Sequence, residues 1–132
     1  MDLSGKIAWV TGASSGIGEA LAKGLAARGA ALILSGRRTD ELMRVGKEAG
    51  TDASIIPFEA TDYDELPSVV EAAMKWCGSV DLLINNAGVS QRSLALDTSF
   101  DVYRRIMEID FFAPLRLTQL VLPSMIEARS GH

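Results

Sequence analysis

The 132-residue sequence has few of the residues that bind metals or form disulfides. It contains one cysteine, Cys77, and one histidine, His132, which is the last residue. One cysteine cannot form an internal disulfide, and one terminal histidine supports neither a metal cluster nor a histidine-based catalytic triad. We therefore expect no metal site. Cys77 ends an apolar helical pattern, so we interpret it as a structural thiol rather than a nucleophile.

The sequence also lacks a strong basic bias and long apolar runs. Its formal net charge is −4, and its largest basic groups are two arginine pairs, at positions 37–38 and 104–105. We therefore expect no nucleic-acid interface. Because no segment has the pattern of a signal peptide or a membrane span, we expect a cytoplasmic protein without membrane contact. Hydrophobic residues make up 48% of the chain, enough for the core of one domain over residues 1–132.

Short apolar runs alternate with longer helical patterns along the chain. The predicted strands are Ile7–Val10, Ala31–Leu34, Ala53–Pro57 and Leu82–Ile84. The predicted helices are Gly16–Arg28, one that follows the cap Thr39 and ends near Gly50, Asp62–Cys77 with Thr61 as its N-cap, and a longer one from Thr98 or Ser99 to about Arg129. This alternation predicts an α/β fold, in which right-handed crossovers place helices on the faces of a parallel sheet.

A glycine-rich turn, Thr11–Gly18, connects the first predicted strand to the first predicted helix. Gly12 permits a tight turn, Gly16 lets the backbone approach a pyrophosphate, and Gly18 allows close packing of the helix on the strand. Free N–H groups in the first helical turn, together with the helix dipole, favour a diphosphate without a lysine. The turn predicts a dinucleotide phosphate site, although an ordinary strand-to-helix loop can have the same glycine spacing.

A second motif, Asn85–Gly88, follows the fourth predicted strand at the end where parallel sheets bind ligands. This Asn-Asn-Ala-Gly segment, combined with T-G-x-x-x-G-x-G at Thr11–Gly18, resembles the classical short-chain dehydrogenase/reductase family. The resemblance covers essentially the whole chain, including Ile109–Pro114, which is similar to the family's helix with a catalytic asparagine. It implies a Rossmann-type doubly wound parallel sheet with strand order 3-2-1-4, ending before the fifth strand.

The resemblance also implies a nicotinamide cofactor at this end of the sheet. The residues that it assigns to the cofactor from the two motifs are Gly12, Ser14, Ser15, Gly16, Ile17, Gly18, Asn85, Ala87 and Gly88. We expect Asn86 to have mainly a structural role. Taken alone, two adjacent asparagines also fit a turn, because asparagine tolerates left-handed backbone.

The residues at the end of the second predicted strand indicate whether NAD(H) or NADP(H) is the cofactor. Enzymes that bind NAD carry an acidic residue about 20 positions after the glycines, where it accepts hydrogen bonds from the ribose. Here Arg37 lies 19 positions after Gly18, and Arg38 follows it. A guanidinium can bind a 2′-phosphate through bidentate, charge-assisted hydrogen bonds. The sequence therefore favours NADP(H) over NAD(H), the alternative being that both arginines lie in solvent.

Two positions depart from the family's pattern. Glu59, followed by Ala60, stands where similar enzymes carry an aspartate that contacts adenine. It can accept the same hydrogen bond or be a solvated loop acid.

Asp110 stands where the family has its catalytic asparagine, and the resemblance implies that the backbone carbonyl at this position holds a proton-relay water. Pro114 has no N–H to bond that carbonyl, so we expect a kink, which can also be purely structural.

The family's catalytic serine and Tyr-x-x-x-Lys pair have no counterpart in this sequence. The residues four positions after Tyr63 and Tyr103 are Pro67 and Met107. In the family, the lysine lowers the pKa of the tyrosine, which exchanges a proton with the substrate oxygen while hydride moves to or from nicotinamide. We interpret the chain as the N-terminal cofactor-binding part of an oxidoreductase acting on a small alcohol or carbonyl compound, and we expect it to be inactive alone.

Other interpretations stay open at this point. A non-catalytic nucleotide-binding or regulatory module would use the same turn without chemistry, whereas a flavodoxin-like domain would lack the paired motifs. Apolar residues surround much of the final helix, which indicates burial on more than one side. The resemblance implies a homo-oligomer through this helix, and the alternative is that it packs wholly within the parent subunit. An unpaired fourth strand would also favour association. The loop Val89–Leu96 is either one wall of a substrate pocket or an exposed polar loop.

Overall fold

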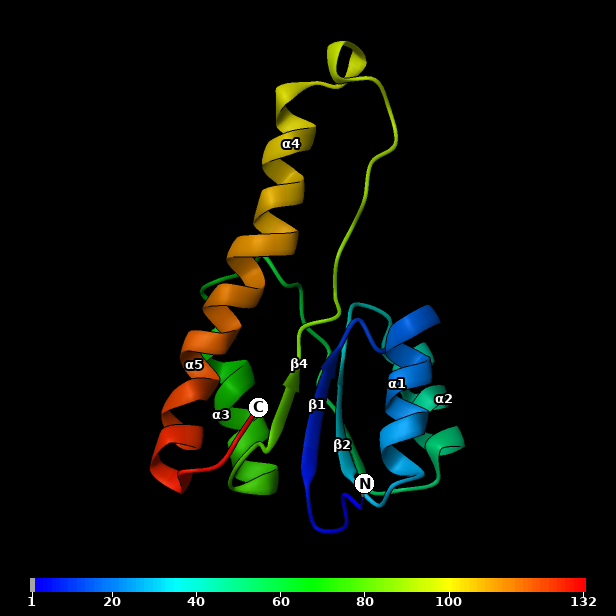
Figure 1. Cartoon of the computed structure of the whole chain (residues 1–132), viewed down its shortest axis with the longest axis vertical. Coiled ribbons are helices and arrows are strands. Elements are labelled where there is room, and N and C mark those ends of the chain that lie inside the picture. The colour runs from blue at the N-terminus through cyan, green and yellow to red at the C-terminus, as the bar shows by residue number, and fades with distance from the viewer. Residues whose placement is uncertain (1) are drawn as a thin grey trace.

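A central parallel sheet lies between two layers of helices in the computed structural model, which describes residues 2–132 (Figure 1). The strands are β1 (Ile7–Thr11), β2 (Ala31–Ser35), β3 (Ala53–Ile55) and β4 (Leu82–Ile84). All pairs are parallel, and the strand order is β3-β2-β1-β4. The predicted Rossmann-type fold and its strand order are therefore confirmed. Met1 lies outside the described residues.

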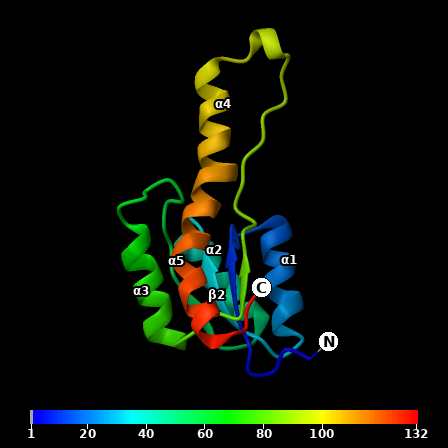
Figure 2. The same cartoon turned by 60° about the vertical axis from the view of Figure 1, so that its left-hand side comes forward.

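Both faces of the sheet are covered. Helices α1 (Gly16–Ala26) and α2 (Thr39–Ala49) lie on one face, and α3 (Leu66–Cys77) and α5 (Ala113–Ala128) lie on the other (Figures 1 and 2). Alternate residues of β1 serve the two cores: Val10 packs in the cluster that includes Leu42 of α2, and Trp9 in the cluster that includes Val69 of α3. Burial on both faces explains why these strands are continuous apolar runs rather than alternating ones.

The helix before β4 is shorter than predicted. It begins at Leu66 rather than Asp62, and its N-cap is Glu65 rather than Thr61. Pro67 decides this boundary, because it has no N–H to donate inside a helix but fits the first turn. Residues 62–65 instead form turns closed by bonds from Asp62 N–H to Glu59 O and from Glu65 N–H to Asp62 O.

Other ends differ from the prediction by a few residues. Helix α1 stops at Ala26 because Arg28 and Gly29 donate to carbonyls three residues back, which tightens the last turn. Thr39 is the first residue of α2 rather than its cap, which is Arg38. Strand β3 ends at Ile55, before Pro57, which has no N–H for a sheet hydrogen bond.

The predicted long final helix is interrupted. It consists of α4 (Phe100–Met107), a single π-helical segment η2 (Glu108–Phe112) and α5. In η2, Ala113 N–H bonds to Glu108 O, five residues back. Pro114 cannot donate to Asp110 O, so this is where the regular α-helical bonding fails. Helix α4 extends well beyond the sheet, beside the chain that leads from β4 to a short 3₁₀ helix η1 (Ala95–Asp97) (Figures 1 and 2).

The outer edge of β4 is bonded to the last residue of the chain. His132 N–H donates to Asp81 O, and Leu83 N–H donates to His132 O, both at 2.9 Å. These bonds flank Leu82 in the pattern of a parallel strand pair. The expectation that β4 is an unpaired edge strand is therefore wrong at Leu82, where its outer edge is hydrogen-bonded. Within residues 2–132, none of the helices combines the length and apolar character needed to cross a membrane.

Candidate cofactor site

A groove of about 1050 Å³ opens at the carboxyl ends of the strands. This is where open α/β sheets bind their ligands. The glycine-rich turn, the end of β2, the loop after β3 and the segment after β4 line it, together with the region where α4 meets α5. The predicted cofactor contacts that line it are Gly12, Ser14, Ser15, Ile17, Arg37, Arg38, Glu59, Ala60, Asn85, Ala87 and Gly88. Gly16 and Gly18 belong to the same turn but are not part of the lining.

The three glycines of the turn have different structural roles. Gly12 and Gly16 have φ angles of +62° and +57°, which side chains rarely adopt. Gly16 has open space where its Cβ would be, so a ligand can approach the backbone there. Gly18 is packed against the turn itself, since a Cβ on it would lie 2.1 Å from Gly12 O.

The N-terminus of α1 points its free donors toward the turn. Its N-cap is Ser15, whose hydroxyl makes no capping hydrogen bond. The first N–H groups of the helix are therefore not occupied by a side-chain cap. Such donors, combined with the positive end of the helix dipole, form an anion site.

Thr11 and Asn86 hold the turn against the segment after β4. The buried Thr11 hydroxyl accepts hydrogen bonds from Asn86 N–H and Ala87 N–H, each at 3.0 Å, and donates to Ile84 O at 3.3 Å. The Asn86 side-chain amide donates to Thr11 O and Gly12 O, each at 3.1 Å. Asn86 therefore has a structural position. Thr11 was not among the predicted site residues, and its place at the start of the glycine motif is the sequence signal for it.

Asn85 lies beside helix α5 as well as beside the groove. Its side-chain amide donates to the Thr118 hydroxyl at 3.0 Å, and that hydroxyl donates to Pro114 O at 2.7 Å. The end of β4 is thereby tied to the first turns of α5. Thr118 was also missed from the sequence, where nothing local distinguishes it from other polar residues of the helix.

Two arginines occupy the rim of the groove at the end of β2. Arg38 Nη2 donates to the Ser14 hydroxyl at 3.4 Å, so it lies against the glycine-rich turn. Arg37 is 71% exposed, and its Nη1 is 3.9 Å from Glu59 Oε2. An ion pair this long and this exposed contributes little to stability. Both guanidinium groups are therefore available to an anionic ligand.

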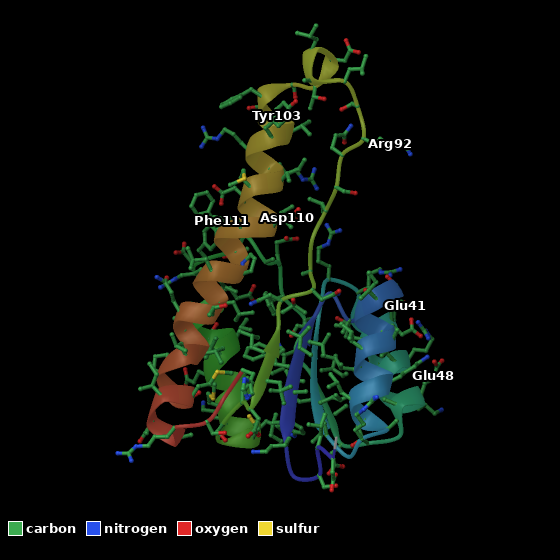
Figure 3. All side chains as sticks on the ribbon, in the orientation of Figure 1. Glu41, Glu48, Arg92, Tyr103, Asp110 and Phe111 are labelled. Atoms are coloured by element: carbon green, nitrogen blue, oxygen red, sulfur yellow. The ribbon has the colours of Figure 1, made fainter. Side chains whose placement is uncertain are left out.

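Asp110 faces the segment after β4, on the opposite side of the helix from Phe111 (Figure 3). Its Oδ1 accepts a hydrogen bond from Val89 N–H at 2.8 Å and lies 3.2 Å from where a Cβ on Gly88 would be. The carboxylate thus acts as an acceptor, which an asparagine oxygen can also do. Asp110 does not line the groove, whereas its neighbours Glu108 and Ile109 do. The role predicted for its backbone carbonyl stays a prediction.

Tyr63 and Glu108 join two walls of the groove. The Tyr63 hydroxyl, on the loop after β3, donates a hydrogen bond to Glu108 Oε2, on η2. Burial and the Glu108 carboxylate raise the pKa of Tyr63 to about 12. The raised pKa favours the neutral phenol, which is the form that donates the hydrogen bond to Glu108.

Outside the groove, the largest pKa shifts among residues 2–132 belong to an ion-pair cluster on α1 and α2, in which hydrogen bonds from Arg44 and Lys23 lower the pKa of Glu19 to about 2. Burial raises the pKa of the Cys77 thiol, whose sulfur bonds to Ala73 O at 3.1 Å. Among residues 2–132, no group of three or more histidine, cysteine, aspartate or glutamate side chains is arranged to hold a metal ion. The groove is therefore the feature from which function can be argued.

The chain matches the family model described as short chain dehydrogenase over residues 6–132. It belongs to the short-chain dehydrogenase family. This short-chain dehydrogenase chain is 43% identical over 137 residues to human dehydrogenase/reductase SDR family member 7, a match that covers 98% of the chain and 40% of that protein. It is 40% identical over 130 residues to mouse member 7B, covering 93% of the chain and 40% of that protein. The chain thus spans about two fifths of the length of these curated relatives.

Solved structures of short-chain dehydrogenases share this fold. A metagenomic short-chain oxidoreductase in complex with NADP superimposes with a TM-score of 0.92 and 32% identity, covering 98% of this chain and 61% of that one. L-Sorbose reductase from Gluconobacter frateurii, complexed with NADPH and L-sorbose, has a TM-score of 0.92 and 30% identity. The match covers 99% of this chain and 51% of that one.

Proposed function

We propose that this short-chain dehydrogenase chain binds NADP(H) in the groove, with the 2′-phosphate at Arg37, Arg38 and Ser14. The observation that carries the proposal is the position of both arginines on the groove rim, one of them against the Ser14 hydroxyl. Guanidinium groups are the side chains best suited to a phosphate, because their N–H donors match its oxygens. Relatives of known structure were obtained with NADP or NADPH, which supports the same choice.

The rest of the groove fits a dinucleotide. The diphosphate would lie on the turn Gly12–Gly18, where the uncapped N–H groups of α1 supply donors and Gly16 leaves the backbone accessible. Glu59 and Ala60 would flank the adenine, and the segment Asn85–Gly88 would form the floor beneath the ribose. In this proposal, hydrogen-bond donors would face the anionic part of the cofactor, and bare backbone would face the part that must approach closely.

We also propose the reaction of the protein to which these residues belong. It is hydride transfer between nicotinamide and a small alcohol or carbonyl compound, with residues 1–132 as the dinucleotide-binding part of one Rossmann domain. The serine and Tyr-x-x-x-Lys pair needed for proton transfer would lie outside these residues. Within them, the Tyr63 hydroxyl is committed to Glu108. Because Tyr63 is hydrogen-bonded to Glu108, these residues also fit the second candidate, a non-catalytic nucleotide-binding module.

Titration of the chain with NADPH and NADH tests the cofactor proposal. We expect saturable binding of both and tighter binding of NADPH, followed by the change in nucleotide fluorescence. Flavin mononucleotide serves as the control and should not bind. Equal affinity for NADPH and NADH would contradict the assignment of the arginines, and no binding of either would contradict the proposed function.

We further propose that the chain forms a homo-oligomer through α5 and the adjoining η2. This surface keeps large apolar side chains in solvent, namely Phe111, Phe112, Leu115, Leu122 and Ile126. Exposed apolar patches of this kind are typical of protein interfaces.

Sedimentation velocity at micromolar concentration tests this association. We expect a dimer or a larger species for the wild type and a shift toward monomer for Leu122→Glu, because a carboxylate would be buried in the interface. Met43→Glu places the same change on an exposed apolar residue of α2, in the other helix layer, and should leave the oligomer intact. A monomeric wild type would overturn the proposal.

A further inference from the structure

Backbone hydrogen bonds tie the loop between β3 and α3 to β2 and the residue after it only over the loop's first residues. Ile56 N–H donates to Leu34 O at 3.0 Å, and Phe58 N–H donates to Gly36 O at 3.1 Å. Beyond Phe58, the loop's own backbone bonds are local turns that end at Glu65. Nevertheless, residues 58–61 of this loop line the groove. Between Phe58 and the buried Leu66 that begins α3, the position of this wall therefore depends on side-chain contacts.

The Tyr63 side chain attaches the far part of this loop to another element. Its hydroxyl bonds to Glu108, which is 45 residues away in sequence and is the first residue of η2. Glu108 lines the main groove and also a smaller cavity of about 320 Å³, which Tyr63 helps to line. Figures 1 and 2 both show the loop passing the junction of α4 and α5. The bond thus joins the loop to the helix at the wall of the groove.

The same π-helical segment also holds the chain that follows Asn85–Gly88. Two residues after Glu108, the Asp110 carboxylate accepts the hydrogen bond from Val89 N–H, directly after the Asn85–Gly88 floor. Segment η2 therefore makes one side-chain contact with the loop after β3 and another with the chain after β4. A regular α-helix turns by about 100° per residue, so side chains two residues apart lie on different sides of its axis. The wider π turn changes the angle between the Glu108 and Asp110 side chains.

We propose that Tyr63 and Glu108 are positioning residues for the cofactor, because their hydrogen bond holds the loop after β3 against η2 and so preforms the adenine side of the groove. This inference rests on the proposed binding of NADP(H). A loop that is already ordered costs less conformational entropy on binding than one that must be ordered by the ligand. The pair touches neither the 2′-phosphate site nor the diphosphate turn, so its loss should weaken NADPH and NADH equally.

Cofactor titrations of matched variants test the proposal. Tyr63→Phe removes only the hydroxyl, and we expect the dissociation constants of NADPH and NADH each to rise about 3–10-fold, with their ratio unchanged. Glu108→Ala should have the same effect, whereas Glu108→Gln keeps an acceptor oxygen and should stay within about 2-fold of the wild type. Tyr103→Phe, on α4 outside the groove, is the control and should change nothing.

Amide hydrogen exchange on the ligand-free chain separates this inference from the proposed function. We expect residues 59–65 to exchange faster in Tyr63→Phe and Glu108→Ala than in the wild type, Glu108→Gln and Tyr103→Phe. If the wild type binds neither nucleotide, the proposed function fails and the positioning role fails with it, while the exchange data still decide whether the bond holds the loop. Unchanged cofactor binding in Tyr63→Phe, or a Glu108→Gln variant as weak as Glu108→Ala, would overturn the proposal.

Discussion

Replacing Gly18 by alanine is expected to lower the free energy of unfolding by about 3 kcal/mol and to abolish nucleotide binding. The new Cβ would lie 2.1 Å from Gly12 O and 2.5 Å from Asn86 Nδ2. These atoms cannot easily move away, because they form the hydrogen bond that holds the glycine-rich turn to the segment after β4. Either that bond breaks or α1 shifts away from the strand, and both changes distort the phosphate turn.

Urea denaturation followed by circular dichroism measures this effect, and Gly24→Ala is the matched control. Gly24 lies on the same helix, and the nearest atom to its added Cβ is Arg28 Nη1 at 3.7 Å. Because alanine is favoured over glycine inside a helix by about 1 kcal/mol, this variant should be at least as stable as the wild type. If both variants unfold at the same urea concentration, the close packing at Gly18 is not what stabilises the turn.

Replacing Arg37 by aspartate is expected to weaken NADPH binding by about 10–100-fold, since charge-assisted hydrogen bonds are each worth about 1.5–3 kcal/mol. NADH should be affected little, because an acidic residue at this position can accept a hydrogen bond from the free ribose hydroxyl. The fold should tolerate the change, because Arg37 is largely exposed and its pairing with Glu59 is long. The ratio of the two dissociation constants, measured by fluorescence titration, is the decisive quantity.

Arg129→Asp makes the same change in charge at an exposed residue after α5, outside the groove. It separates a local phosphate contact from a general loss of positive charge, which acts over about 10 Å at 0.1 M salt. We expect its NADPH to NADH ratio to match that of the wild type. An unchanged ratio in Arg37→Asp, or an equal change in both variants, would refute the assignment.

Much of the fold could be predicted because its signals are local. Continuous apolar runs such as Ile7–Val10 mark strands buried on both faces, and glycines mark the turns that need positive φ. Pro114 marked the place where the final helix departs from regular α-helical bonding. The missed boundary at Leu66 was also readable, since Pro67 fits the first turn of a helix and not its interior.

The sequence by itself thus determined the family, the parallel sheet, the strand order and the turn that faces the groove. Only the tertiary structure decided how the walls of the groove are joined, through Thr11 with Asn86, Asn85 with Thr118, Asp110 with Val89, and Tyr63 with Glu108. The physical reason is that each of these hydrogen bonds connects residues 21–75 positions apart. A bond of this range forms only when strand ends and helices have packed, so no local pattern of polarity specifies its partner.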